Sequence, residues 1–174
     1  MVILLTGATH TGKTVLSQRL MERLAIPYFS LDHLKMGLIR SGYTALTPYQ
    51  DDALCSLLWP IAREMAKTVV ENRQSLILEG AYISLSYADD FSEDYAPHIR
   101  FLCLVMSERY LRRHYADVLR HANDAERRLS DSDCTLDFLI EENARYLAGC
   151  RAHGCPYHLI DSRYDLDALC ALFA

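Results

Sequence analysis

Five short apolar segments occur along the chain, and segments with the spacing of amphipathic helices separate them. The apolar segments are residues 2–6, 27–31, 75–79, 99–105 and 156–161. Short segments that are apolar throughout are typical of strands buried on both faces of a parallel sheet. Helices are predicted over residues 13–25, the first part of 33–49, 50–72, 107–129, 135–149 and 165–173. Strands that alternate with helices predict an α/β fold with a mainly parallel sheet.

Local features are also expected in two stretches of the chain. The helix predicted over 50–72 contains Pro60, which should kink it or begin a second segment. The stretch 84–98 is acidic and aromatic and should form a loop with one helical turn. The aromatic residues in and beside it could stack on a bound molecule, or the stretch could be a surface flap; they are Tyr82, Tyr87, Phe91 and Tyr95.

Composition limits the class of protein. The chain has 174 residues, about the size of one domain, and no repeat or flexible linker divides it, so we expect a single domain over 1–174. Hydrophobic residues make up 51% and charged residues 24%, which excludes a disordered or fibrous chain. The sequence has no apolar run long enough to span a membrane and no signal peptide pattern, so we expect a cytoplasmic protein with no membrane partner. The net charge of −5 argues against nucleic acid as the main partner.

The six cysteines favour a structural role. No C-x-x-C pair is present, and the nearest two, Cys150 and Cys155, are separated by four residues that include His153. A zinc site would need tighter pairs and four ligands, so we interpret the cysteines as small core residues.

One motif has a specific chemical purpose. The segment Gly7-Ala8-Thr9-His10-Thr11-Gly12-Lys13-Thr14 fits the pattern G-x-x-x-x-G-K-[ST]. Two glycines allow a tight turn that points successive backbone N–H groups into one concavity, and the following helix directs its positive end there. A chance glycine turn with a surface lysine is the alternative. A buried strand before the motif and an amphipathic helix after it favour a phosphate-binding loop, or P-loop.

The side chains of this loop have distinct expected roles. Lys13 can reach the β- and γ-phosphates of a nucleotide, and the Thr14 hydroxyl can be a ligand of Mg²⁺. The His10 side chain could touch phosphate or substrate, or point to solvent, which we favour. The whole loop from Gly7 to Thr14 is the predicted site for ATP.

Within the proteins that carry this loop, the chain resembles the small P-loop kinases. It lacks the N-K-x-D signature of GTPases and the strand ending in Asp-Glu of motor ATPases. The resemblance rests on G-A-T-H-T-G-K-T, S-L-D-H-L at 30–34, L-I-L-E-G at 76–80 and an arginine-rich helix after the fourth strand. Similar proteins include nucleoside-monophosphate, shikimate and gluconate kinases and relatives of chloramphenicol phosphotransferase. The chain lacks the D-G-x-P-R of adenylate kinases and the G-G-G of shikimate kinases, which puts those two acceptors in doubt.

The resemblance implies a three-layer fold and a reaction. The fold would be a five-stranded parallel sheet of order 2-3-1-4-5 with helices on both faces and a mobile, arginine-rich lid at about 107–134. The donor would be Mg-ATP, and a small-molecule acceptor would bind above the strand ends. The general rule for open α/β sheets also places ligands at the carboxyl ends of the strands.

Two carboxylates are expected at these strand ends. Asp32, at the end of the second strand, could orient or deprotonate the acceptor hydroxyl, or could serve as a helix N-cap. Glu79, at the end of the third strand, could act on Mg²⁺ through water, could bind the acceptor, or could be a solvated strand end. Both are candidate substrate contacts, and Asp32 is a candidate catalytic residue.

Arginines follow the fourth strand. On a continuous helix Arg109, Arg113, Arg120 and Arg127 share one face, opposite an apolar face. Guanidinium groups pair well with phosphate, so we expect Arg113 and Arg120 to stabilise the transferring phosphoryl group. The alternatives are a solvated charged face, or a helix broken at Asn123-Asp124 with Arg127 and Arg128 in the lid.

The segment after the fifth strand completes the predicted nucleotide site. In the resembled kinases this loop lies against the adenine, which assigns Asp161 and Ser162 to cofactor binding; an ordinary turn is the alternative. We therefore expect a kinase that moves the γ-phosphoryl of Mg-ATP to a hydroxyl or phosphate of a small molecule. An ATP-binding switch or slow NTPase acting through a protein partner is the main alternative, and a non-catalytic module is a third. The acceptor and the oligomeric state are not predicted.

Overall fold

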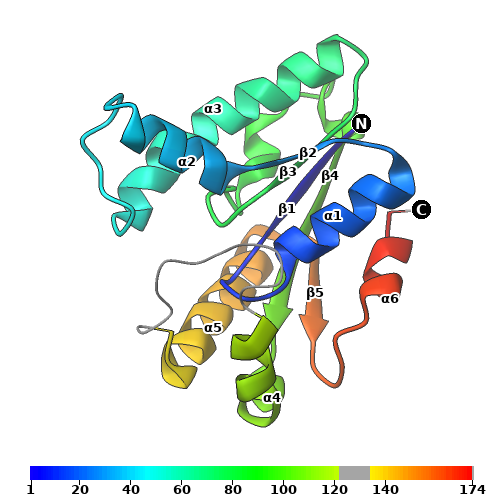
Figure 1. Cartoon of the computed structure of the whole chain (residues 1–174). Coiled ribbons are helices and arrows are strands. Elements are labelled where there is room, and N and C mark those ends of the chain that lie inside the picture. Colours follow the sequence, from blue (N-terminus) through cyan, green and yellow to red (C-terminus); the bar gives the residue numbers. More distant parts are fainter. Residues whose placement is uncertain (122–133, 174) are drawn as a thin grey trace.

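The computed structural model describes residues 1–121 and 134–173, and its core is a five-stranded parallel sheet (Figure 1). The strands are β1 (Val2–Gly7), β2 (Tyr28–Ser30), β3 (Leu76–Glu79), β4 (Ile99–Met106) and β5 (Tyr157–Ile160). Their order is β2-β3-β1-β4-β5, and every neighbouring pair is parallel. The predicted three-layer α/β fold and strand order are confirmed.

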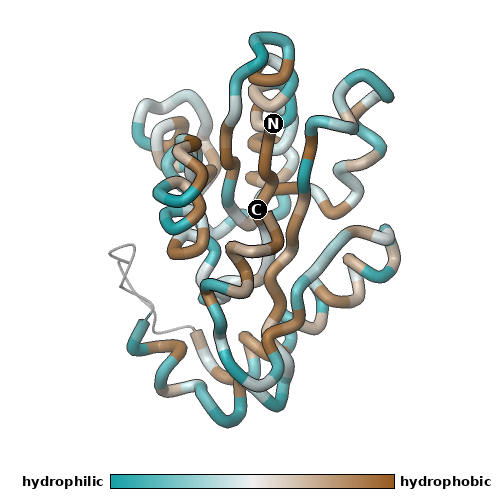
Figure 2. Tube along the Cα trace, turned by 90° about the vertical axis from the view of Figure 1, so that its right-hand side faces the viewer, coloured by the Kyte–Doolittle hydropathy of each residue, from teal (hydrophilic) through white to brown (hydrophobic). Residues whose placement is uncertain are grey.

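Helices cover both faces of this sheet. They are α1 (Lys13–Leu24), α2 (Leu31–Arg40), α3 (Asp51–Glu71), α4 (Glu108–Arg120), α5 (Leu136–His153) and α6 (Leu166–Ala171), with short 3₁₀ turns η1 (Tyr87–Asp90) and η2 (Ala96–His98). One core cluster joins α1 and α6 to one face, and a second joins α3 and α5 to the other. Strand β1 supplies alternate residues to the two clusters, with Ile3 and Leu5 on one side and Val2 and Leu4 on the other. Figure 2 shows the hydrophobic strands running through the interior.

Three predicted boundaries change. Pro60 lies inside α3, which continues as one helix from Asp51 to Glu71 rather than starting a second segment. The second strand ends at Ser30, so Asp32 lies in the first turn of α2 and is not its N-cap, because Ser30 occupies that position. The helix predicted over 107–129 is α4, which ends at Arg120 and has a non-helical residue, His114, inside it (φ −120°, ψ 15°).

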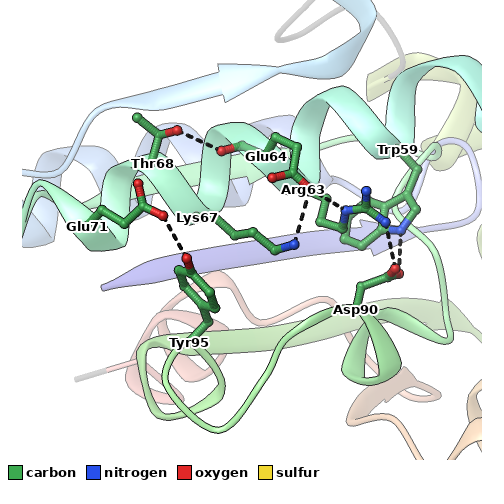
Figure 3. Close-up of polar contacts among 8 residues, drawn as sticks. All are labelled: Trp59, Arg63, Glu64, Lys67, Thr68, Glu71, Asp90 and Tyr95. Carbon is green, nitrogen blue, oxygen red and sulfur yellow. Dashed lines mark hydrogen bonds and ion pairs between the residues drawn. The ribbon is translucent and has the colours of Figure 1, made fainter.

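The acidic aromatic stretch after β3 is fixed to α3 by polar contacts (Figure 3). The Asp90 carboxylate accepts hydrogen bonds from Trp59 Nε1 and Arg63 Nη1, each at 2.8 Å. Tyr95 donates to Glu71 Oε1 at 2.6 Å. Together with two 3₁₀ turns, these contacts make the stretch a fastened segment rather than a loose flap.

No helix within residues 1–121 and 134–173 has both the length and the apolar character needed to cross a membrane.

Candidate functional site

The P-loop connects β1 to α1 and has the backbone that the motif predicts. Gly7 has φ +139°, and a Cβ there would lie 2.1 Å from the carbonyl oxygen of Leu104 on the adjacent strand. Gly12 has φ +80°, and α1 begins at the next residue. Both positions therefore need glycine, one for close strand approach and both for a positive φ. The result is a turn that ends at a helix N-terminus, which is a favourable place for phosphate.

Contacts within the loop fix its shape. Thr11 is buried and its hydroxyl donates to the carbonyl oxygen of Ala8 at 2.8 Å. Lys13 Nζ donates to the same carbonyl at 2.7 Å. Lys13 therefore folds back over its own loop, where its ammonium lies close to the phosphate-binding concavity. His10 has φ +62°, and its Nδ1 lies 3.0 Å from Thr9 Oγ1 and 3.4 Å from Cys134 Sγ. The His10 side chain therefore lines the cavity and contacts Thr9 and Cys134, rather than pointing only to solvent as expected.

Two cavity-lining residues from the second half of the chain form hydrogen bonds with the backbone of the loop. The backbone N–H of Thr9 donates to Glu142 Oε2 of α5 at 2.8 Å. Tyr164, after β5, donates from its hydroxyl to the carbonyl oxygen of Gly12 at 3.2 Å. Neither Glu142 nor Tyr164 was predicted, because each lies more than 130 residues from its partner and belongs to no recognised motif.

Thr14 and Glu79 come together at the mouth of the loop. Thr14 Oγ1 lies 3.4 Å from Glu79 Oε1, and Glu79 is only 1% exposed. The interpretation of Glu79 as a solvated strand end is therefore wrong. A hydroxyl beside a carboxylate is a donor set that suits Mg²⁺. This pair is the place where the described residues could hold that ion.

A large cavity extends from the P-loop over the carboxyl ends of the strands. Its volume is about 1700 Å³, and Lys13, Thr14, Asp32 and Glu79 all line it. Helices α2 and α3 form the wall at one end, and the segment after β5 contributes Ser162. The structure thus brings the predicted phosphate, metal and acceptor residues to one cavity.

A polar network that the sequence did not predict lines the α2–α3 end of this cavity. Lys35 Nζ lies 2.5 Å from Asp32 Oδ1 and donates to Tyr82 Oη at 2.9 Å. The Tyr82 hydroxyl donates in turn to Asp51 Oδ1 at 3.3 Å, at the start of α3. We call these four residues the acceptor network. The available signal was the i, i+3 spacing of Asp32 and Lys35 on one helix, in a chain with only three lysines.

Burial and charge shift the pKa values within this network. Burial raises the pKa of Tyr82 to about 12, although the adjacent Lys35 acts in the opposite direction. Burial alone would lower the pKa of Lys35, but the charge of Asp32 and the hydrogen bonds to Asp32 and Tyr82 outweigh it, so the pKa is raised. Lys35 is therefore a cation and Tyr82 a neutral hydroxyl throughout the neutral pH range.

The predicted arginines lie elsewhere. Arg113 and Arg120 are exposed, and neither lines the cavity formed by the described residues. Arg120 Nη1 pairs with Asp117 at 3.0 Å. The break at His114 ends the continuous face that would align the arginines, and α4 presents Tyr110, His114 and Asp117 to the cavity. Arg127 and Arg128 lie outside the described residues.

Other arginines do line the cavity, namely Arg40 of α2, Arg145 of α5 and Arg163 after β5. After β5, Ser162 lines the cavity, whereas Asp161 pairs with Arg109. Hydrogen bonding to Ser107, with a contribution from Arg109, lowers the pKa of Asp161. The contact of Asp161 and Ser162 with adenine and the action of Arg113 and Arg120 on phosphate stay predictions.

No protein-family model and no curated protein matches this chain. Several solved structures have a similar fold. A "putative kinase" from Chloroflexus aurantiacus has a TM-score of 0.59 and 21% identity over 99% of this chain and 95% of its own. A gluconokinase from Sinorhizobium meliloti has a TM-score of 0.56 and 17% identity, covering 98% and 87%. A shikimate kinase from Aquifex aeolicus has a TM-score of 0.51 and 15% identity, covering 99% and 93%.

These neighbours match nearly the full length of the chain, and its parallel sheet of order β2-β3-β1-β4-β5 agrees with their fold. At such low identity the likeness concerns the fold. The chain therefore has the fold of the P-loop kinases.

Proposed function

We propose that this protein is an ATP-dependent small-molecule kinase that moves the γ-phosphoryl group of Mg-ATP to a hydroxyl or phosphate of an acceptor. The observation that carries the proposal is the shared cavity. Lys13 and Thr14 of the P-loop line the same space as Asp32 and the rest of the acceptor network. A donor and an acceptor could therefore meet without leaving the protein, which is what phosphoryl transfer requires.

The residues divide the work as follows for a hydroxyl acceptor. Backbone N–H groups of the P-loop and Lys13 bind the phosphates and oppose their negative charge. Asp32 orients the acceptor hydroxyl and accepts its proton as the acceptor oxygen bonds to the γ-phosphorus. The bond from that phosphorus to the bridging oxygen of ADP breaks, and ADP leaves with the electron pair.

Thr14 and Glu79 are the residues that would hold Mg²⁺, directly or through water. When bound, the ion would neutralise charge on the phosphate oxygens. The deep burial of Glu79 keeps its carboxylate in place for this task.

The test measures the rate of ADP release by the protein in the presence of Mg-ATP. It is run without an acceptor and with a panel of nucleosides, nucleotides, sugars and hydroxy acids. We expect acceptor-dependent release. Lys13→Ala should reduce it by about 10²–10³-fold, because one charge-stabilising donor is lost. Asp32→Asn should reduce it by about 10²–10⁴-fold, because the proton acceptor is lost.

Lys67→Ala and Asp89→Asn are the matched controls, since both residues lie outside the cavity and should leave the rate unchanged. ATP binding with no acceptor-dependent release, or turnover raised only by a protein partner, would contradict the proposal and favour a nucleotide-dependent switch.

A further inference from the structure

The ion pair between Asp32 and Lys35 leaves two ligand positions open beside one another. An ammonium has three N–H donors. The described structure gives Lys35 two acceptors, Asp32 Oδ1 and Tyr82 Oη. One donor therefore remains, and Lys35 lines the cavity with only 14% of its side chain exposed. Asp32 uses one carboxylate oxygen for Lys35, is 40% exposed and lines the same cavity, so its other oxygen can accept a hydrogen bond from a ligand.

The network holds this pair in a fixed orientation. Tyr82 is 5% exposed, accepts from Lys35 and donates to Asp51. Lys35 also lies over the Tyr82 ring, with Nζ 5.1 Å from the ring centroid. Because Lys35 is bound on two sides, its remaining donor has a restricted direction. A restricted donor beside a carboxylate oxygen is suited to two neighbouring oxygen atoms, one that donates a proton and one that accepts.

The charge of this end of the cavity argues against a phosphate acceptor. Asp32, Asp51 and Asp52 line this end of the cavity in the described structure, with Lys35 and Arg40 as cations, and Arg145 of α5, whose charge acts on Cys55 of α3, lines the cavity as well. The charge of Lys35 is already balanced by Asp32 at 2.5 Å. The three cations match the three carboxylates in number, so this wall has no excess positive charge to attract the two negative charges of a nucleoside monophosphate.

We propose that Lys35 is a specificity-determining residue, and that with Asp32 it selects an alcohol whose reacting hydroxyl has a second oxygen on the neighbouring carbon. This inference rests on the proposed kinase function and narrows its acceptor. The reacting hydroxyl donates its proton to the open oxygen of Asp32. The neighbouring oxygen accepts the remaining N–H of Lys35. Lys35 takes no part in bond making, so it acts on acceptor binding and alignment.

The test uses acceptors that differ by one oxygen. The pairs are D-glycerate and 3-hydroxypropionate, glycerol and 1,3-propanediol, and 1,2-propanediol and 1-propanol, with AMP and CMP as phosphate acceptors. ADP release in Mg-ATP gives kcat and KM for each. For the pairs that are turned over, the wild-type protein should prefer the member with the neighbouring oxygen by about tenfold or more in kcat/KM, the contribution of a hydrogen bond to a charged group.

Variants of Lys35 separate recognition from structure. Lys35→Met should abolish the preference, mainly by raising KM for the oxygen-bearing member, and should leave ATP affinity unchanged. Lys35→Arg should restore part of the preference because it returns a charged donor. Lys67→Met, on α3 outside the cavity, is the matched control and should keep the full preference. If Lys35→Met does not fold, as judged by its thermal unfolding curve, Lys35→Ala supports the same comparison, because it also removes the donor.

Each outcome decides the proposal. Faster turnover of AMP or CMP than of any alcohol would overturn the inference while the kinase function stands. A preference that survives in Lys35→Met, or an equal loss for both members of a pair, would overturn it as well. If no acceptor raises ADP release, the kinase function fails and the inference fails with it.

Discussion

At the scale of single residues, Tyr82 links the Asp32–Lys35 ion pair to Asp51 within the acceptor network. Its hydroxyl accepts from Lys35 and donates to Asp51, and burial raises its pKa to about 12. The folded protein therefore binds the phenolic proton more tightly than the unfolded chain, whose tyrosines titrate near 10. This contribution to stability is complete below about pH 10 and is lost as the pH rises towards 12.

Tyr82→Phe tests this dependence. At pH 8 it should lower the free energy of unfolding by about 1 kcal/mol, because two hydrogen bonds lose their shared hydroxyl. The difference from wild type should shrink between pH 10 and pH 11. Urea unfolding followed by circular dichroism at pH 8, 10 and 11 measures it. Tyr43→Phe is the control, since Tyr43 is 80% exposed, and a pH-independent difference for Tyr82→Phe would contradict the argument.

The residues that could be predicted from sequence are those whose role is local. The P-loop is contiguous, so its glycines, Lys13 and Thr14 follow from one motif. Glu79 and Asp32 follow from strand ends, although sequence could not show that Glu79 is buried against Thr14. Tyr164 and Glu142 reach the loop only through the tertiary fold, and Lys35 gains its significance only from Tyr82, which lies 47 residues away.

At the scale of elements, α3 and the segment after β3 behave as one unit (Figure 3). Trp59, Arg63 and Glu71 of α3 hold that segment at Asp90 and Tyr95. The Trp59 and Phe91 rings also pack edge to face, with centroids 6.3 Å apart. Tyr82 precedes this segment and Asp51 begins α3. These contacts therefore help to place Tyr82 and Asp51, two members of the acceptor network, beside each other at the cavity wall.

Asp90→Ala should loosen this unit. We expect a loss of about 1–3 kcal/mol in the free energy of unfolding, because the indole N–H of the buried Trp59 and the guanidinium of Arg63 lose their acceptor. Thermal or urea unfolding measures the loss, and Asp89→Ala on the exposed neighbouring position should change it by less than about 0.5 kcal/mol. Equal stability of the two variants would show that the contacts to Asp90 are not stabilising.

Element boundaries show where periodicity is insufficient. The central strands β1 and β4 give the strongest signal because they are apolar and buried on both faces, whereas β5 is partly exposed at Tyr157 and Leu159. Pro60 did not divide α3, as tertiary packing of Leu58, Trp59 and Ala62 holds the helix on both sides of it. His114 interrupts α4 without any glycine or proline, so no sequence pattern marked the break that redirects the arginines.

At the scale of the whole molecule, three core clusters support one cavity. Two of them fix the faces of the sheet, and a third joins α4, the start of α5 and the end of β5 beside the cavity. Ala8 of the P-loop and Leu31 and Tyr82 at the α2–α3 end of the cavity belong to the same cluster, so one packed core supports both ends. A ligand that contacts the P-loop binds the native state alone, so it should stabilise the entire fold.

Mg-ATP should raise the unfolding temperature for this reason. At a free concentration 100 times its Kd, we expect a gain of about 2.7 kcal/mol in the free energy of unfolding. Part of this increase in unfolding temperature should depend on Mg²⁺, measured as the difference between thermal scans with ATP and Mg²⁺ and scans with ATP and EDTA. Glu79→Gln should remove most of that Mg²⁺-dependent increase. An unchanged Mg²⁺-dependent part in Glu79→Gln would exclude this carboxylate as a holder of the ion. Lys67→Ala should give the full shift.

The hydrogen bonds that join the P-loop to Glu142 and Tyr164 have a consequence for folding during synthesis. The loop leaves the ribosome before Glu142 and Tyr164, which bind it from more than 130 residues further along the chain. A nascent chain that has already folded β1 and α1 still lacks both of these hydrogen-bond partners. The loop should therefore reach its final rigidity only after α5 and the segment that follows β5 have been synthesised and packed beside it.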